Sequence, residues 1–115
     1  MKGMLLLTIG MVIFSTSSLA GAETVSPILL DVRTSQEYEK GHLEGSILIP
    51  YDRISKEIST VVKDKSQKIH LYCRSGRRSK IAKEALQEMG YKNILDLGSM
   101  ENASRVLNRR IIVSK

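Results

Sequence analysis

The chain has 115 residues, which is enough for a single domain. It carries 18 lysines and arginines against 12 acidic side chains, and the resulting net charge of +6 favours anionic ligands. Aromatic residues make up only 4% of the chain, which leaves few rings to stack on bases and argues against a nucleic-acid-binding protein.

The amino-terminal residues have the pattern of a secretory signal peptide. Lys2 gives a short positive start, residues 4–14 form an apolar run, and residues 20–22 (Ala-Gly-Ala) fit the small-residue cleavage pattern. We therefore predict a signal peptide at residues 1–22 and a mature domain at residues 23–115. This domain is expected in the periplasm or, alternatively, outside the cell.

An uncleaved membrane anchor is the alternative for this segment. Its apolar run is shorter than the roughly 20 residues that a membrane-spanning helix needs, so we expect no stable membrane insertion after cleavage. The only cysteine is Cys73, which excludes a lipid-bearing cysteine after the run. A lone cysteine also cannot form a disulfide within its own chain, so it is either an inert buried side chain or a reactive one.

The first predicted strand covers residues 28–32, an apolar run without alternation, as expected for a strand buried on both faces. Thr34 and Glu37 follow it with the spacing of a capping box. This pattern predicts a short helix that runs to Lys40 and stops at Gly41.

A second strand is predicted over residues 46–49, with Pro50 ending it. Asp52 is placed to cap the next helix, and residues 63–67 form a polar loop after it. The apolar face of this helix consists of Ile54, Ile58, Val61 and Val62.

A third strand over residues 68–72 leads directly to the cysteine. A helix is predicted from Ser79 onward, and Gly90 ends it. Its apolar positions at helical spacing are Ile81, Ala82, Ala85, Leu86 and Met89.

The last predicted unit is a strand over residues 91–97, with Gly98 as its turn and Ser99 as the cap of a final helix. The apolar positions of that helix are Met100, Ala103, Val106 and Leu107. Residues 109–113 fit the pattern poorly and form either a tail or a small edge strand.

Strand and helix thus alternate four times along the chain. This order predicts an α/β fold with a parallel sheet of four to five strands, right-handed crossovers and helices on both faces. In such sheets the ligand site lies beyond the carboxyl ends of the strands, and Cys73 is located at one of these ends.

The segment from Cys73 to Ser79 has the composition of an anion-binding loop. The positive end of the following helix and nearby cations lower the pKa of a thiol and favour the nucleophilic thiolate. Gly76 permits a tight curl of backbone whose N–H groups turn toward the sulfur. A basic surface turn beside a structural thiol would explain the charges, but not this order of strand, thiol, glycine and helix start. The cationic side chains are Arg74, Arg77, Arg78 and Lys80.

Residues 73–79 have the form C-x-x-G-x-R-S and resemble the active-site loop of the rhodanese family of sulfurtransferases. The resemblance covers roughly residues 27–98, and with the export signal it points to the small exported single-domain rhodaneses of the phage shock protein E type. The other matching segments are residues 30–33 with 37–38, 41–46 with 49–50, and 88–91.

This resemblance implies a monomeric thiosulfate sulfurtransferase with no cofactor and no metal. Cys73 would be the catalytic residue, which takes the outer sulfur of thiosulfate as a persulfide and passes it to cyanide or a thiol. The arginine that holds the donor is left open, and Ser79 is either a hydroxyl donor or only a helix cap. The substrate-binding residues implied by the resemblance are Arg74, Ser75, Gly76, Arg77, Arg78 and Ser79.

Two other functions are alternatives to this one. A persulfide carrier with little turnover would need the same loop, so the sequence does not separate it from an enzyme. A cysteine-dependent phosphatase or arsenate reductase would have C-x5-R, with an arginine at the position of Ser79. Here the arginine falls one residue earlier, at Arg78, and the shorter loop favours a single sulfur atom over phosphate.

Several polar residues outside the loop are expected to have structural roles. Asp31 and Arg33 lie at a strand end, where a buried ion pair or loop brace is favoured over catalysis. For His42 we expect a hydrogen bond in a turn, and for His70 packing within a strand. No second histidine or cysteine lies near His70 in the sequence, so no zinc site is predicted.

Overall fold

A computed structural model describes residues 26–113 of the chain. The predicted signal peptide at residues 1–22 lies outside the described residues. Between residues 26 and 113, none of the helices has the length and apolar composition that crossing a membrane requires.

The fold is built on a sheet of four parallel strands in the order β3-β1-β4-β5. The predicted α/β architecture is therefore confirmed, and the apolar run of residues 28–32 supplies a central strand. The strands of this sheet are β1 (Ile28–Asp31), β3 (Ile47–Leu48), β4 (Ile69–Cys73) and β5 (Ile94–Ser99).

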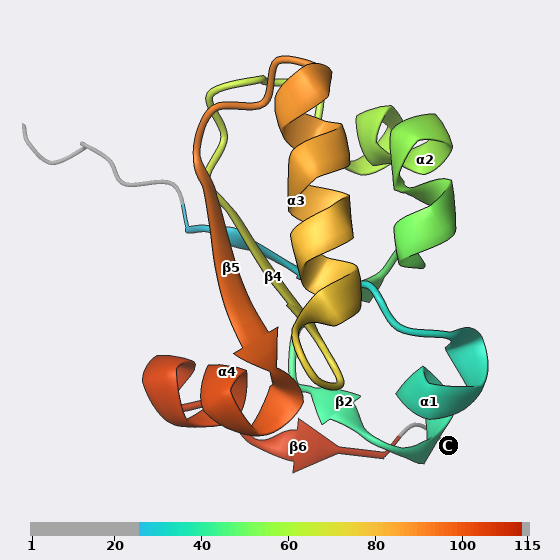
Figure 1. The fold of residues 1–115 in the computed structure, drawn as a ribbon. Helices are drawn as coiled ribbons and strands as arrows, with labels where there is room; N and C mark the ends of the chain where they lie inside the picture. The colour runs from blue at the N-terminus through green and yellow to red at the C-terminus, as the bar shows by residue number, and fades with distance from the viewer. Residues whose placement is uncertain (1–25, 114–115) are drawn as a thin grey trace, which may run out of the picture.

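Helices cover both faces of the sheet, as predicted. In Figure 1, α2 and α3 lie on one side of the strands, while α4 lies near their carboxyl ends together with β2 and β6. The helices are α1 (Ser35–Lys40), α2 (Ile54–Val61), α3 (Arg77–Glu88) and α4 (Met100–Leu107), with a 3-10 turn η1 (Tyr51–Arg53) before α2.

Alternation along β4 divides its side chains between two hydrophobic cores. Leu71 and Cys73 belong to the core beneath α2 and α3, whereas Tyr72 belongs to the core that contains Ala103 of α4. Cys73 is the last residue of β4, and its side chain shares a face of the sheet with Leu71, the face that α3 covers.

Some predicted boundaries were wrong. Asp52 does not cap α2, because η1 intervenes and the cap position is Arg53, which makes no side-chain capping bond. The third helix begins at Arg77 and not at Ser79, since its cap is the left-handed Gly76. Gly98 is not a turn after β5 but a residue inside it, at φ +75°, next to a shift in the β4–β5 register.

The open choice for residues 109–113 is settled by an antiparallel pair of short strands. Ile111 and Ile112 form β6, which pairs with β2 (His42–Leu43), a strand that the sequence did not indicate. The pair joins the carboxyl-terminal segment to the loop after α1.

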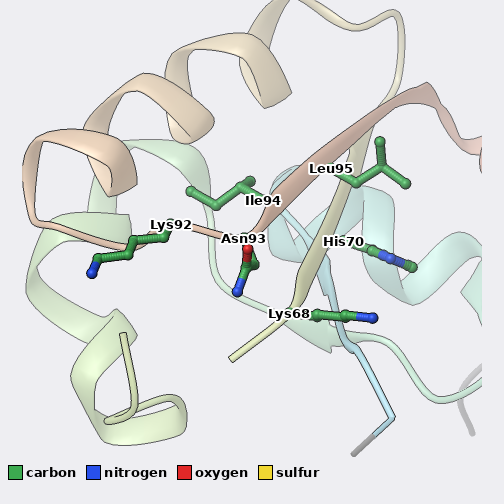
Figure 2. A pocket seen from close by; sticks show the side chains of 6 residues that line it. All are labelled: Lys68, His70, Lys92, Asn93, Ile94 and Leu95. Atoms are coloured by element: carbon green, nitrogen blue, oxygen red, sulfur yellow. The ribbon is translucent and has the colours of Figure 1, made fainter. Parts of the chain in front are cut away.

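One part of the sheet, at the amino ends of β4 and β5, has an open hollow of about 300 Å³. Figure 2 shows Lys68, His70 and Leu95 pointing to the same side of the strands, and Ile94 to the opposite side. Leu95 is 48% exposed there. This amino-end hollow is lined by Lys68, His70, Lys92, Asn93, Ile94 and Leu95.

Candidate active site

The loop between β4 and α3 curls around the sulfur of Cys73. Gly76 adopts a left-handed conformation at φ +103°, which a residue with a side chain rarely adopts. The amide nitrogen of Gly76 donates a hydrogen bond to Cys73 Sγ at 2.9 Å. Cys73 has no exposed surface, but polar groups of the loop contact its sulfur, unlike that of an inert cysteine surrounded by hydrocarbon.

These contacts shift the protonation of the thiol. Burial raises the pKa of Cys73, but hydrogen bonds from the Ser79 side chain and from the amides of Ser79, Gly76 and Ser75 lower it by more. The net pKa lies below that of an ordinary cysteine, so the loop favours the thiolate, which is the nucleophilic form.

Ser79 is buried inside the first turn of α3, and its hydroxyl has three neighbours. Ser79 Oγ lies 3.6 Å from Cys73 Sγ, 3.1 Å from the carbonyl oxygen of Gly76 and 2.6 Å from Asp96 Oδ1. Of the two roles left open for Ser79, the helix-cap role is wrong, since Gly76 occupies the cap position.

Arg78 is turned away from the loop toward α1. Its Nη1 and Nη2 atoms donate to the two carboxylate oxygens of Glu37 at 2.8 and 3.0 Å. This bidentate ion pair lowers the pKa of Glu37 to about 2, chiefly through the hydrogen bonds from Arg78. Arg78 therefore joins the cysteine loop to α1, and Glu37 balances part of its charge.

Arg74 lines a second hollow, of about 320 Å³, beside the cysteine loop. This carboxyl-end hollow is lined by Arg33, Glu37, Lys40, Arg74, Met100 and Glu101. Arg77 and Ser75 are both exposed, and within residues 26–113 neither Arg74 nor Arg77 forms an ion pair. Of the three arginines predicted in the loop, Arg74 is thus the one that combines an unbalanced charge with a place in the hollow.

Three of the polar residues expected to be structural, Asp31, Arg33 and His42, make the predicted kinds of contact. Arg33 and Asp31 form a buried ion pair at 2.6 Å, and Arg33 also donates to the carbonyl oxygen of Gly41. His42 Nδ1 lies 2.8 Å from the carbonyl oxygen of Tyr38, and the two rings stack. These contacts brace the loops at the carboxyl ends of the strands.

Two residues of the site were not predicted, Glu37 as the partner of Arg78 and Asp96 as the partner of Ser79. Glu37 was assigned to the capping box, which the structure confirms, but its carboxylate also binds Arg78. Asp96 interrupts an apolar strand. A lone carboxylate in such a run is the sequence signal that could have indicated a polar partner for it.

No metal site emerges from the described part of the chain, since residues 26–113 contain no group of three His, Cys, Asp or Glu side chains placed to hold a metal ion.

Comparison with known proteins places these features in context. The sequence matches the family model described as a rhodanese-like domain over residues 17–104. It is 38% identical over 73 residues to the thiosulfate sulfurtransferase PspE of Escherichia coli (strain K12), covering 64% of this chain and 70% of that one. It is also 33% identical over 69 residues to the putative sulfur carrier protein YrkF of Bacillus subtilis (strain 168), covering 60% of this chain but only 36% of YrkF.

A solved structure is also similar. A rhodanese with anions from E. coli superimposes with a TM-score of 0.70 at 31% sequence identity, over 77% of this chain and the whole of that one.

Proposed function

The chain belongs to the rhodanese family, and on this basis we propose that it moves the outer sulfur of thiosulfate to a thiol or cyanide through a persulfide on Cys73. The observation that carries the proposal is the hydrogen bond from the Gly76 amide to Cys73 Sγ at 2.9 Å. An amide aimed at a sulfur stabilises negative charge there, as the donors of an oxyanion hole do for oxygen.

The proposed reaction has two half-reactions. The Cys73 thiolate attacks the outer sulfur of thiosulfate, so a bond forms between the two sulfurs while the bond to the sulfonate breaks and sulfite leaves with its electron pair. An acceptor thiolate or cyanide then attacks the outer sulfur of the persulfide. The sulfur–sulfur bond to Cys73 breaks, and its electron pair returns to Cys73 as the thiolate.

We assign Arg74 to the sulfonate group of the donor. Arg74 follows Cys73 in the chain and lines the carboxyl-end hollow, whereas Arg78 is occupied by Glu37 and Arg77 does not line this hollow. A guanidinium offers a planar set of N–H donors that fits the oxygens of an oxyanion. The amides of Ser75, Gly76 and Ser79 would hold the sulfur itself.

A persulfide carrier with little turnover is the second candidate. The resemblance to a protein described as a putative sulfur carrier favours it, and a carrier needs the same stabilised sulfur. The two candidates differ in what happens after loading, because an enzyme discharges to small acceptors quickly and repeatedly.

The experiment that tests the proposal is the intact mass of the protein after exposure to thiosulfate. We expect the gain of one sulfur atom, lost on addition of cyanide or dithiothreitol, and no gain in Cys73→Ser. A wild-type protein that gains no sulfur would overturn the proposal. Repeated turnover with either acceptor would support the enzyme, and a single discharge would support the carrier.

The proposal includes a location and an assembly state. We propose that residues 1–22 direct export to the periplasm and that the mature domain works as a monomer. Mass spectrometry of the protein recovered from the periplasm would give both the cleavage position and the location.

A further inference from the structure

The hydroxyl of Ser79 connects the sulfur of Cys73 to Asp96. This carboxylate has no role in the proposed reaction. Asp96 lies in β5 and is half-buried, and its Oδ1 accepts hydrogen bonds from Ser79 Oγ at 2.6 Å and from the Gly98 amide at 2.9 Å. Cys73 Sγ, Ser79 Oγ and Asp96 Oδ1 thus form a continuous chain of polar contacts inside the protein.

A serine hydroxyl has one proton to donate, so its possible acceptors compete. Hydrogen bonds to an ionised carboxylate are shorter and stronger than those to neutral oxygen, and the contact with Asp96 is the shortest that Ser79 makes. Asp96 therefore competes with the Cys73 thiolate for the single proton of Ser79. The hydrogen bond from Ser79 still lowers the pKa of Cys73, but it is weaker than it would be without this carboxylate.

The charge of Asp96 acts in the same direction, since two negative groups in a poorly solvated region repel each other. Arg78 from α3 is a charged group whose pKa the thiol helps to raise, and Glu37 from α1 and Tyr51 from η1 act on the same guanidinium. Arg78 opposes Asp96, but Glu37 balances part of the Arg78 charge. Asp96 is thus the negative group that reaches Cys73 through a hydrogen bond.

In a persulfide the negative charge moves from Sγ to the outer sulfur, about 2 Å away along the new bond. Ser79 contacts Sγ, so weakening of its hydrogen bond by Asp96 affects the thiolate more than the persulfide. We propose that Asp96, acting as a positioning residue through the Ser79 hydroxyl, disfavours the free Cys73 thiolate relative to the persulfide and holds the protein in its sulfur-loaded state. This inference rests on the proposed function, because it requires a persulfide.

The consequence for the reaction is an asymmetry between its two halves. Transfer to an acceptor expels the Cys73 thiolate, and a less stable thiolate leaves more slowly. Asp96 therefore slows discharge and raises the loaded fraction at a given ratio of thiosulfate to sulfite. Such a bias suits a protein that holds its sulfur until a competent acceptor arrives.

The test measures the pH dependence of iodoacetamide alkylation, which reports on Cys73 because it is the only cysteine. In Asp96→Asn the acceptor is neutral and competes less for the Ser79 proton, so we expect a lower midpoint and alkylation about threefold to tenfold faster below it. Asp96→Ala removes the acceptor and should shift the midpoint further. In a Ser79→Ala background, the effect of Asp96→Asn should shrink to that of the charge alone.

Asp64→Asn is the matched control, because it removes one negative charge from the exposed loop before β4 and keeps its bond to Ser66. Its midpoint should equal that of the wild type. The loaded fraction in mixtures of thiosulfate and sulfite, measured by intact mass, should fall in Asp96→Asn.

An Asp96→Asn midpoint at or above the wild-type value would overturn the inference, as would an unchanged loaded fraction. A wild-type protein that never gains sulfur would instead overturn the proposed function, while the alkylation midpoints would still be measured. The two failures are therefore distinguishable.

Discussion

The two ends of strands β4 and β5 resemble each other in shape and charge but differ in chemistry. Each end has a hollow of about 300 Å³, and each hollow is lined by cationic side chains, Arg74 and Lys40 at the carboxyl end and Lys68 and Lys92 at the amino end. The carboxyl end adjoins a buried thiol that receives an amide hydrogen bond, whereas the amino end presents an exposed leucine. Positive charge and a hollow are thus common to both ends, whereas the thiol is located at the carboxyl end.

The direction of the helices accounts for the difference. In a parallel α/β fold a helix starts at the carboxyl end of each strand, where its unpaired N–H groups favour anions. Helices finish at the other end, where unpaired carbonyl groups favour cations. At that end Lys65 Nζ donates to the carbonyl oxygen of Met89 at 2.6 Å, just past α3. Lys65 thus binds a carbonyl group of the protein itself.

The largest expected effect comes from a comparison of the two glycines that flank α3. Gly76 and Gly90 have nearly the same left-handed conformation, at φ +103° and +98°, and an added Cβ meets no close contact at either. An alanine should therefore strain the backbone equally at both positions, by about 1–2 kcal/mol. At Gly76 the strain also displaces the amide that holds Cys73 Sγ.

We expect Gly76→Ala to slow persulfide formation by about tenfold to a hundredfold, and Gly90→Ala to leave it unchanged, because loss of one such donor has effects of this order. Single-turnover loading by thiosulfate and urea unfolding of both variants provide the measurement. Equal loading rates in the two variants would show that the Gly76 amide does not stabilise the reacting sulfur.

A smaller effect is expected from removal of one positive charge at either end of the strands. Arg74→Gln should raise the KM for thiosulfate about tenfold, since the guanidinium is assigned to the sulfonate of the donor. Lys68→Gln, which changes the net charge by the same amount, should leave KM unchanged. Steady-state kinetics at fixed ionic strength would test this, and equal increases in both variants would point to general attraction of anions instead of a contact.

The contrast between the two ends also shows what a sequence reveals. The strand, the thiol, the glycine and the cations of residues 73–79 are adjacent in the chain, so the loop could be predicted from local rules. Asp96 and Glu37 reach the loop through tertiary contacts across 17 and 41 residues, and no local pattern reports such distances. The β2–β6 pair was missed for the same reason, because two-residue strands have no periodicity to detect.

Two of the boundaries that were predicted wrongly also concern the loop. Ser79 is a good cap residue by type, but the left-handed turn at Gly76 starts the helix earlier and places Ser79 inside it. Gly98 was interpreted as a turn, whereas its positive φ instead accommodates an irregularity in β5 opposite the end of β4. Residue type marked Ser79 and Gly98 as positions with a special backbone role. Tertiary packing determined which role each residue has.

The smallest expected effect concerns the Glu37–Arg78 pair that joins the loop to α1. The pair holds the pKa of Glu37 at about 2, below its ordinary value of 4.5, so its stabilisation is fully present above pH 4.5 and is lost as the pH falls toward 2. The Glu37 side chain is 25% exposed and partly screened by solvent, so we expect Glu37→Gln to cost about 1 kcal/mol of unfolding free energy at pH 7.

Urea unfolding at pH 7 and near pH 2.5 would measure this cost, with Glu57→Gln as the control. Arg53 and Glu57 form a similar contact at 2.7 Å but are 60% and 37% exposed, so that variant should change little at either pH. A Glu37→Gln deficit that persists at low pH would mean that the charge of the carboxylate is not responsible. A deficit that disappears would show that the cysteine loop is held to α1 by charge.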